Sequence, residues 1–170
     1  MEEKEISLTL EEQVVSFLQD KNFHISFAES CTGGLCAARL VGVASASAVF
    51  DAGVVTYANE AKIKYLGVKP ETIESYGVVS EPVAGQMAEG VAKAQNAEVG
   101  VGVSGIAGPS GGTETKPVGM VCFGFYMDGE LTTVTKRFGD LGRNVVREAA
   151  TEFVYEKLYE LLGGKENETV

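Results

Sequence analysis

HISFAESCTGGLCAARLV, residues 24–41, places a strand, a tight turn and a helix in direct succession. Residues 24–28 alternate like a short strand, Gly33 and Gly34 permit a sharp turn, and residues 35–41 have the composition of a helix. A strand that leads directly into a helix is the unit from which α/β domains are built. The stretch therefore predicts an α/β fold with Ser30 at a strand-to-helix corner.

Elements of both kinds continue along the rest of the chain. Ser80-Glu81-Pro82 is a helix start, Asn59 is expected to cap a short helix that ends before Gly67, and Asp128-Gly129 predicts a β-hairpin. The expected helices cover residues 10–23, 59–66, 81–95 and 143–162, with a helical turn from Lys69; the expected strands cover 48–57, 99–103, 118–126 and 131–138.

This order predicts a three-layer α/β/α sandwich around a mixed, mostly parallel sheet of about five strands, because the hairpin requires at least one antiparallel strand. Residues 10–162 form the expected domain. Residues 1–9 are expected to be a polar lead-in, and residues 163–170 a flexible tail.

Composition restricts the class of partner. With 24 acidic and 14 basic residues the formal net charge is −10, which argues against nucleic acid as a partner but allows a small phosphorylated ligand. The chain shows neither a secretory leader nor a run apolar enough for a membrane span. Three unpatterned cysteines and one histidine favour a cytoplasmic protein without a disulfide scaffold or a structural zinc site.

Ser30 is the candidate nucleophile. At a strand-to-helix corner its hydroxyl points outward, and the backbone N–H groups of Thr32, Gly33 and Gly34 could stabilise an oxyanion beside it. The alternative is that Ser30 or Thr32 only caps the following helix, as most such residues do.

Lys62 is the candidate base. His24 lies six residues before Ser30, roughly 20 Å away if that stretch is extended, so a Ser-His-Asp triad is nearly excluded. Lys62 is expected in the first turn of a helix, where the helix dipole and partial desolvation lower the pKa of an amine. Tyr57 could orient this base, contact the substrate or simply pack, and an exposed position remains the alternative for Lys62.

A second glycine-rich segment follows the strand at 99–103. Gly100, Gly102 and Gly105 spell G-x-G-x-x-G, but they lie within the strand and no helix follows, so the segment is not a dinucleotide-binding fingerprint. Its loop still allows close approach of a ligand, or is an ordinary turn. Ser104, Ser110 and Thr113 are its candidate donors, and Arg143 and Lys116 are candidate cations for an anionic ligand, or solvated charges.

Four motifs carry a resemblance to a known family. They are Ala28-Glu-Ser-Cys-Thr-Gly-Gly34, Val55-Thr-Tyr-Ala-Asn-Glu-Ala-Lys62, Gly77-Val-Val-Ser-Glu-Pro82, and Val103-Ser-Gly-Ile-Ala-Gly-Pro-Ser-Gly-Gly112 with Lys116-Pro-Val-Gly119. Residues 10–162 resemble the C-terminal domain of CinA, the competence/damage-inducible protein, and its stand-alone form, nicotinamide-nucleotide amidohydrolase.

The resemblance implies hydrolysis of nicotinamide mononucleotide to nicotinic acid mononucleotide and ammonia, without metal or cofactor. It implies a Ser/Lys mechanism that falls on Ser30 and Lys62 with Tyr57 nearby. The phosphate is expected on N–H groups of glycine-rich loops, including Gly105 and Gly108, and on Arg143. The family also implies a homodimer. Larger members carry an additional N-terminal domain associated with ADP-ribose pyrophosphatase activity, and that activity is expected to be absent here.

Two alternatives stay open at this point. One is a nucleotide-binding or interaction module of the same fold that has lost catalysis. The other is an enzyme that hydrolyses a different nucleotide amide or a pyrophosphate, for which a strict need for a divalent metal would be evidence.

Overall fold

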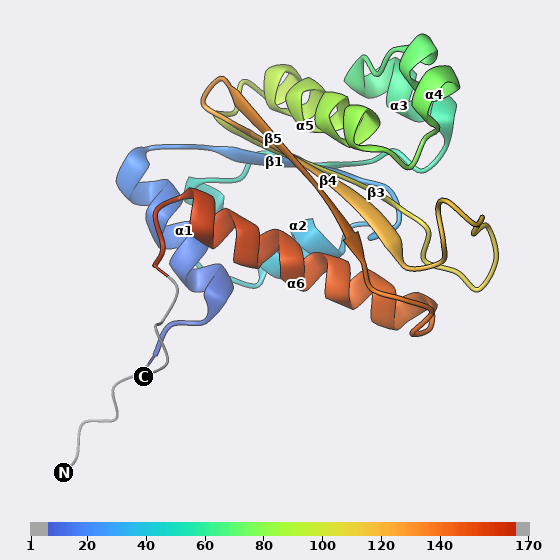
Figure 1. Cartoon of the computed structure of the whole chain (residues 1–170). Coiled ribbons are helices and arrows are strands. Elements are labelled where there is room, and N and C mark those ends of the chain that lie inside the picture. The colour runs from blue at the N-terminus through green and yellow to red at the C-terminus, as the bar shows by residue number, and fades with distance from the viewer. Residues whose placement is uncertain (1–6, 166–170) are drawn as a thin grey trace.

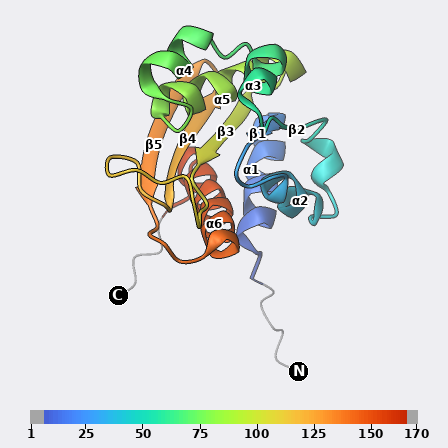
Figure 2. The ribbon, with the colours of Figure 1, turned by 90° about the vertical axis from the view of Figure 1, so that its right-hand side faces the viewer.

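The computed structural model describes residues 7–165, which form one five-stranded sheet covered by helices on both faces (Figures 1 and 2). The elements are α1 (Leu10–Lys21), β1 (Ile25–Glu29), α2 (Leu35–Val41), the 3-10 helix η1 (Ala46–Ala48), β2 (Val54–Val55), α3 (Asn59–Leu66), α4 (Pro70–Tyr76), α5 (Glu81–Gln95), β3 (Val99–Gly105), β4 (Met120–Met127), β5 (Glu130–Arg137) and α6 (Arg143–Leu161).

The two helical layers differ in how they cover the sheet. The larger apolar cluster joins α1, α2 and α6 to one face, while α5 packs on the other face with α3 and α4 outside it (Figure 2). Helices cover both faces of the sheet at β1 and β3, so β1 is buried along its whole length and β3 is buried from Val99 to Ser104. The predicted three-layer α/β/α sandwich is confirmed.

The strand order is β2-β1-β3-β4-β5. Strands β2, β1 and β3 are parallel, and β4 is antiparallel to both β3 and β5, so four of the five strands run in one direction. The chain reverses direction between β4 and β5 at Asp128-Gly129. Both φ angles there are positive, 47° and 93°, as a tight hairpin turn requires. The prediction of a mixed, mostly parallel sheet is therefore correct.

The glycines of β3 allow α5 to approach the sheet closely. A Cβ atom at Gly100 would lie 2.1 Å from the carbonyl oxygen of Ala88, and one at Gly102 would lie 2.2 Å from that of Ala84. These glycines are therefore needed for helix-to-strand packing, which agrees with the rejection of the dinucleotide fingerprint.

Two local predictions were wrong. The strand expected over residues 48–57 is only Val54–Val55, because residues 46–48 form a 3-10 turn and the segment then touches β1 only through single bonds at the sheet edge. Asn59 does not cap α3; it is the first helical residue, and Ala58 precedes the helix in an extended conformation.

The ends of the domain are partly defined by hydrogen bonds. Thr9, which was expected in the lead-in, forms a capping box with Glu12 at the start of α1. Gly164 and Lys165, expected in the flexible tail, both bond to Tyr159 of α6. Residues 1–6 and 166–170 of the predicted lead-in and tail lie outside the described residues. No helix between residues 7 and 165 is long and apolar enough to cross a lipid bilayer.

Candidate active site

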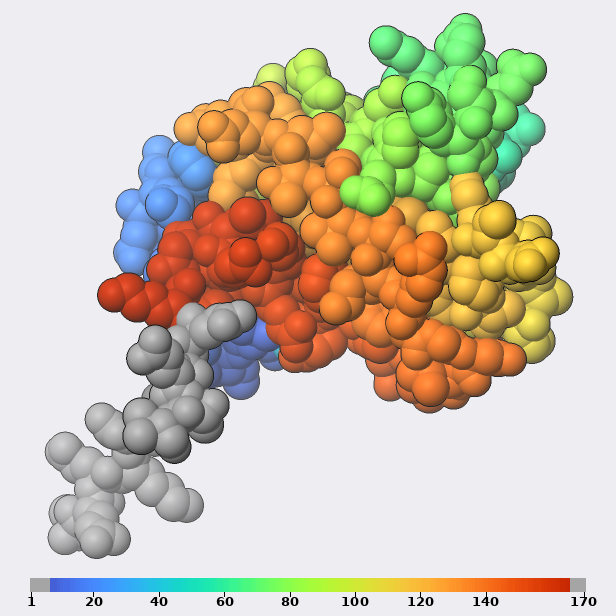
Figure 3. All heavy atoms as spheres, in the orientation of Figure 1, coloured from blue at the N-terminus to red at the C-terminus, as the bar shows by residue number. Residues whose placement is uncertain are grey.

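A cavity of about 470 Å³ lies at the carboxyl ends of β1 and β3. Its walls come from the residues that directly follow β1 and β2, from α3, from the 77–79 turn, from the loop after β3 and from the first residue of α6. Figure 3 shows that loop, residues 106–119, as a surface protrusion (yellow) beside the green α4 segment. Ligands of α/β proteins commonly bind outside the carboxyl ends of strands, so this cavity is the candidate site.

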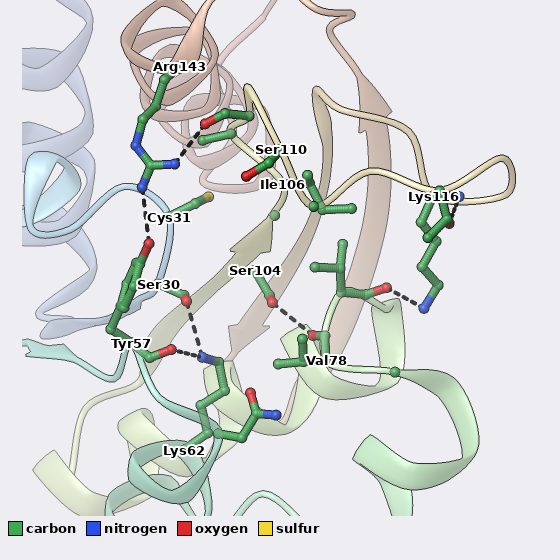
Figure 4. A pocket seen from close by; sticks show the side chains of 18 residues that line it. Ser30, Cys31, Tyr57, Lys62, Val78, Ser104, Ile106, Ser110, Lys116 and Arg143 are labelled. Atoms are coloured by element: carbon green, nitrogen blue, oxygen red, sulfur yellow. Dashed lines mark hydrogen bonds between the residues drawn. The ribbon is translucent and has the colours of Figure 1, made fainter.

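Ser30 and Lys62 meet inside the cavity. Lys62 Nζ lies 3.1 Å from Ser30 Oγ and 3.1 Å from the carbonyl oxygen of Tyr57 (Figure 4). It also lies 2.7 Å from the carbonyl oxygen of Thr56. A neutral amine has two N–H donors and one lone pair. When the two carbonyls accept both N–H groups, the lone pair is left to accept the proton of the Ser30 hydroxyl.

The surroundings of the pair favour a neutral lysine. Lys62 is 1% exposed, and this burial lowers the pKa of its amine below the ordinary value of 10.5. Lys62 does lie in the first turn of α3, as predicted, and burial is the main cause of the shift. Burial also raises the pKa of the neighbouring Cys31 thiol to about 11, so Cys31 is not a thiolate near neutral pH, and Ser30 is the candidate nucleophile because its hydroxyl contacts the Lys62 amine.

Two side chains that the sequence analysis missed hold the turn around Ser30. The buried carboxylate of Glu29 accepts hydrogen bonds from the backbone N–H groups of Cys36 (2.9 Å) and Ala37 (3.1 Å) in the first turn of α2. Arg147 of α6 donates to the carbonyl oxygens of Cys31 (2.9 Å) and Thr32 (3.2 Å). An acidic residue in a strand predicted to be buried could have pointed to Glu29. No local pattern points to Arg147, because it lies more than 100 residues after Ser30 in the sequence.

Thr32, Gly33 and Gly34 are not brought to the cavity. None of them is among the lining residues, and the Gly33 N–H donates to the carbonyl oxygen of Ser30 at 3.1 Å. The carboxylate of Glu29 occupies the N-terminus of α2, where the sequence analysis expected an oxyanion. The three residues predicted to bind the substrate therefore lie outside the lining of this cavity.

Arg143 and Tyr57 lie together at the cavity. The Arg143 guanidinium donates to the Tyr57 hydroxyl at 3.0 Å and to the carbonyl oxygen of Gly108 at 2.8 Å (Figure 4). Tyr57 contacts Lys62 through its backbone carbonyl, so its hydroxyl does not orient the amine as we had considered. Both side chains are exposed, which leaves the cation accessible to a ligand.

The end of β3 and the loop after it supply the other wall. Ser104 Oγ donates to the carbonyl oxygen of Val78 at 2.8 Å, and Thr113 Oγ1 accepts from the Lys116 N–H at 3.1 Å. Lys116 Nζ donates to the carbonyl oxygens of Val79, at 2.7 Å, and of Tyr76. Gly105, Gly108 and Ser110 line the cavity as expected. Lys116 therefore ties this loop to the turn that precedes α5.

Neither a cluster of metal ligands nor the histidine accompanies the Ser30–Lys62 pair in the described part of the chain. Within residues 7–165, no three His, Cys, Asp or Glu side chains are close enough together to hold a metal ion. His24 lies at the opposite end of β1 from Ser30 and pairs with Asp51 at 2.9 Å. The histidine is thus not placed to serve as the base.

Comparison with known proteins identifies the fold family. Residues 7–162 match the family model of the CinA C-terminal domain. This chain belongs to that family. A CinA-like protein of Kosmotoga olearia is 47% identical over 148 residues, which are 87% of this chain and 36% of that protein.

Solved structures of CinA proteins have the same fold. The competence/damage inducible protein of Agrobacterium tumefaciens is 41% identical, with a TM-score of 0.84, and the match covers 92% of this chain and 99% of that one. A CinA superfamily protein of Klebsiella pneumoniae is 35% identical, with a TM-score of 0.86, and the match covers 90% and 95% of the two chains. The chain spans little more than a third of the length of the curated CinA relatives it matches.

Proposed function

We propose that this CinA domain hydrolyses the carboxamide of nicotinamide mononucleotide to nicotinic acid mononucleotide and ammonia. The observation that carries the proposal is the contact of 3.1 Å between Lys62 Nζ and Ser30 Oγ, at a buried amine whose N–H donors have carbonyl acceptors. An amide is a stable bond, and its cleavage without metal requires an activated nucleophile of this kind.

In the proposed reaction, neutral Lys62 takes the proton of Ser30 as the hydroxyl oxygen attacks the amide carbon. The tetrahedral intermediate collapses when the C–N bond breaks and protonated Lys62 gives its proton to the departing ammonia. Water, activated by the same amine, then attacks the acyl ester on Ser30 and releases the carboxylic acid. Ser30 and Lys62 return to their starting protonation states, so no further reactant is needed.

The far side of the cavity supports a phosphorylated substrate. Arg143 is an exposed cation at the cavity and retains N–H donors beyond the two used by Tyr57 and Gly108. Between residues 7 and 165, the N–H groups of Gly108, Ser110 and Gly111 have no hydrogen-bond partner. A guanidinium and free backbone N–H groups are the donors that proteins use for a phosphate monoester. The cavity volume is also in the range of small-molecule sites.

An end-point assay for ammonia tests the proposal. The wild-type chain with nicotinamide mononucleotide is expected to release ammonia in the presence of a chelator, and Ser30→Ala is expected to reduce the rate by at least about a thousandfold. Ser47→Ala, at an exposed serine on η1, is the matched control and should keep the rate. Equal rates for Ser30→Ala and wild type would show that Ser30 is not the nucleophile.

The same assay tests the base. Lys62→Met keeps the length of the side chain but removes the amine, so ammonia release should be lost, while Lys64→Met on the exposed face of α3 should retain it. In the wild type, kcat/KM should rise with pH with a midpoint below 10.5, because the lowered pKa of Lys62 sets the fraction of neutral base. A wild type that binds the mononucleotide without releasing ammonia would instead indicate a binding module.

A further inference from the structure

The hydrolysis proposed above develops a negative charge on the amide oxygen, and donors for that charge are needed close to Ser30. The N-terminus of α2 does not supply them, because Glu29 already bonds to Cys36 and Ala37 there and Thr32 to Gly34 lie outside the cavity. The donors must come from another segment that lines the cavity beside Ser30.

The backbone direction of β3 identifies that segment. Along this strand the odd-numbered residues turn their N–H and C=O groups toward β1: the Val99 N–H donates to the carbonyl oxygen of His24 (3.0 Å), and the carbonyl oxygen of Val103 accepts from the Ser30 N–H (3.1 Å). The even-numbered side faces β4, as the bond from Ile106 N–H to the carbonyl oxygen of Met120 shows (2.9 Å). Gly105 is odd, so its N–H points toward the β1 side.

At Gly105 the hydrogen-bond ladder between the parallel strands β1 and β3 has ended. A continued ladder would bring the carbonyl oxygen of Ser30 to the Gly105 N–H, but the chain turns away after β1 and that oxygen accepts from Gly33 instead. Within the described part of the chain, the Gly105 N–H has no acceptor. Gly105 itself lines the cavity. A fixed N–H donor thus points from the end of β3 into the space next to Ser30.

We infer that the backbone N–H of Gly105 is an oxyanion donor of this site. The inference rests on the proposed function. It assigns the oxyanion hole to the end of β3 rather than to the N-terminus of α2. The second donor is the N–H of Cys31, the residue after the nucleophile, because it too lines the cavity and has no acceptor among residues 7–165.

A pair of variants separates the N–H group from the side chain at this position. A Cβ atom at Gly105 would lie 2.7 Å from a methyl group of Val121, so both variants carry Val121→Ala, which removes that methyl. Gly105→Ala in this background adds a Cβ and keeps the N–H. Gly105→Pro adds a similar Cβ and removes the N–H, and the extended conformation of Ser104 tolerates a following proline.

Two reactions are measured for both variants and for Val121→Ala alone: ammonia release from nicotinamide mononucleotide, and acetylation of Ser30 by 4-nitrophenyl acetate. The Pro variant is expected to lose about 10²- to 10³-fold in kcat and in acetylation rate relative to the Ala variant. Equal acetylation rates for the two would overturn the inference. If the wild type is acetylated at Ser30 but releases no ammonia, only the substrate assignment fails.

A crystal structure of the wild type with pyridine-3-boronic acid gives a second measurement that does not depend on folding of the Pro variant. Boronic acids form a tetrahedral adduct with a nucleophilic serine, and one adduct oxygen takes the place of the oxyanion. An oxygen about 2.7–3.1 Å from Gly105 N supports the inference. An oxygen bonded to N–H groups of residues 32–34 instead would overturn it.

Discussion

At position 62 an amine is buried where an apolar side chain would be the usual choice. Its only partners are two backbone carbonyls and one hydroxyl, and no carboxylate bonds to it among the described residues. Burial without a counter-ion penalises the ammonium form, so the fold maintains a base at the expense of stability below the ordinary pKa of lysine.

This cost can be measured without any substrate. Because the pKa of Lys62 is lowered on folding, the unfolded chain binds more protons than the folded one between the folded-state pKa and 10.5, and the free energy of unfolding rises with pH in that window. The free energy of unfolding of the wild type minus that of Lys62→Met should therefore increase from pH 7 to pH 10, by up to about 1.4 kcal/mol per pH unit where the folded amine is neutral. Any stability advantage of the variant shrinks accordingly.

Urea denaturation at several pH values, with Lys64→Met as the matched control, makes this comparison. A pH-independent difference between wild type and Lys62→Met would mean that the folded protein keeps the ammonium form.

Both members of the Ser30–Lys62 pair could be predicted from the sequence, because a strand-to-helix corner and a lysine in a first helical turn are local patterns. The contacts that hold the turn at Ser30 were harder to predict. An acidic residue in a buried strand pointed to Glu29 but not to its backbone partners at the start of α2, and Arg147 reaches the turn from the other end of the chain.

Among the elements, those with their own start and stop signals were predicted well. Helix α5 begins after Ser80, whose side chain caps it, and the hairpin turns at Asp128-Gly129. The length of strand β2 was overestimated because an edge strand pairs on one side only. Its length depends on pairing with β1 rather than on its own composition. Asn59 was misplaced by one residue, which is the usual uncertainty of a helix boundary.

The N-terminus of α2 is the element on which the turn at Ser30 depends. Glu29→Gln should lower the free energy of unfolding by about 1–3 kcal/mol, because a neutral amide replaces a buried carboxylate that accepts two backbone N–H groups. Denaturant titration measures the change, and Glu74→Gln on the exposed side of α4 is the control. A Glu29→Gln variant as stable as that control would show that the two bonds contribute little.

The whole molecule brings the cavity together from both helical layers. Lys62 comes from α3 on one face of the sheet and Arg143 from α6 on the other, and both line the cavity at the carboxyl ends of the central strands (Figures 2 and 4). In a chain with a net charge of −10, the cations Arg143 and Lys116 that line this cavity are where a small anion is attracted. No single segment of sequence could reveal this arrangement, since it depends on the packing of both layers.

If Arg143 binds the phosphate, removal of its charge should affect binding more than chemistry. Arg143→Met is expected to raise KM for nicotinamide mononucleotide about 10- to 100-fold with a much smaller change in kcat, since a charge-assisted hydrogen bond contributes about 1.5–3 kcal/mol. Initial-rate kinetics give both constants, and Arg137→Met at the exposed end of β5 serves as control. An unchanged KM would move phosphate binding away from Arg143.

The bond between Arg143 and the Tyr57 hydroxyl has an optical consequence. The chain contains six tyrosines and no tryptophan, so its intrinsic fluorescence is tyrosine emission with no indole to mask it. Tyr57 is 62% exposed at the opening of the cavity, and a ligand that draws the guanidinium away changes the environment of its phenol. Occupancy of this site should therefore be visible as a change in ultraviolet emission from the unlabelled protein.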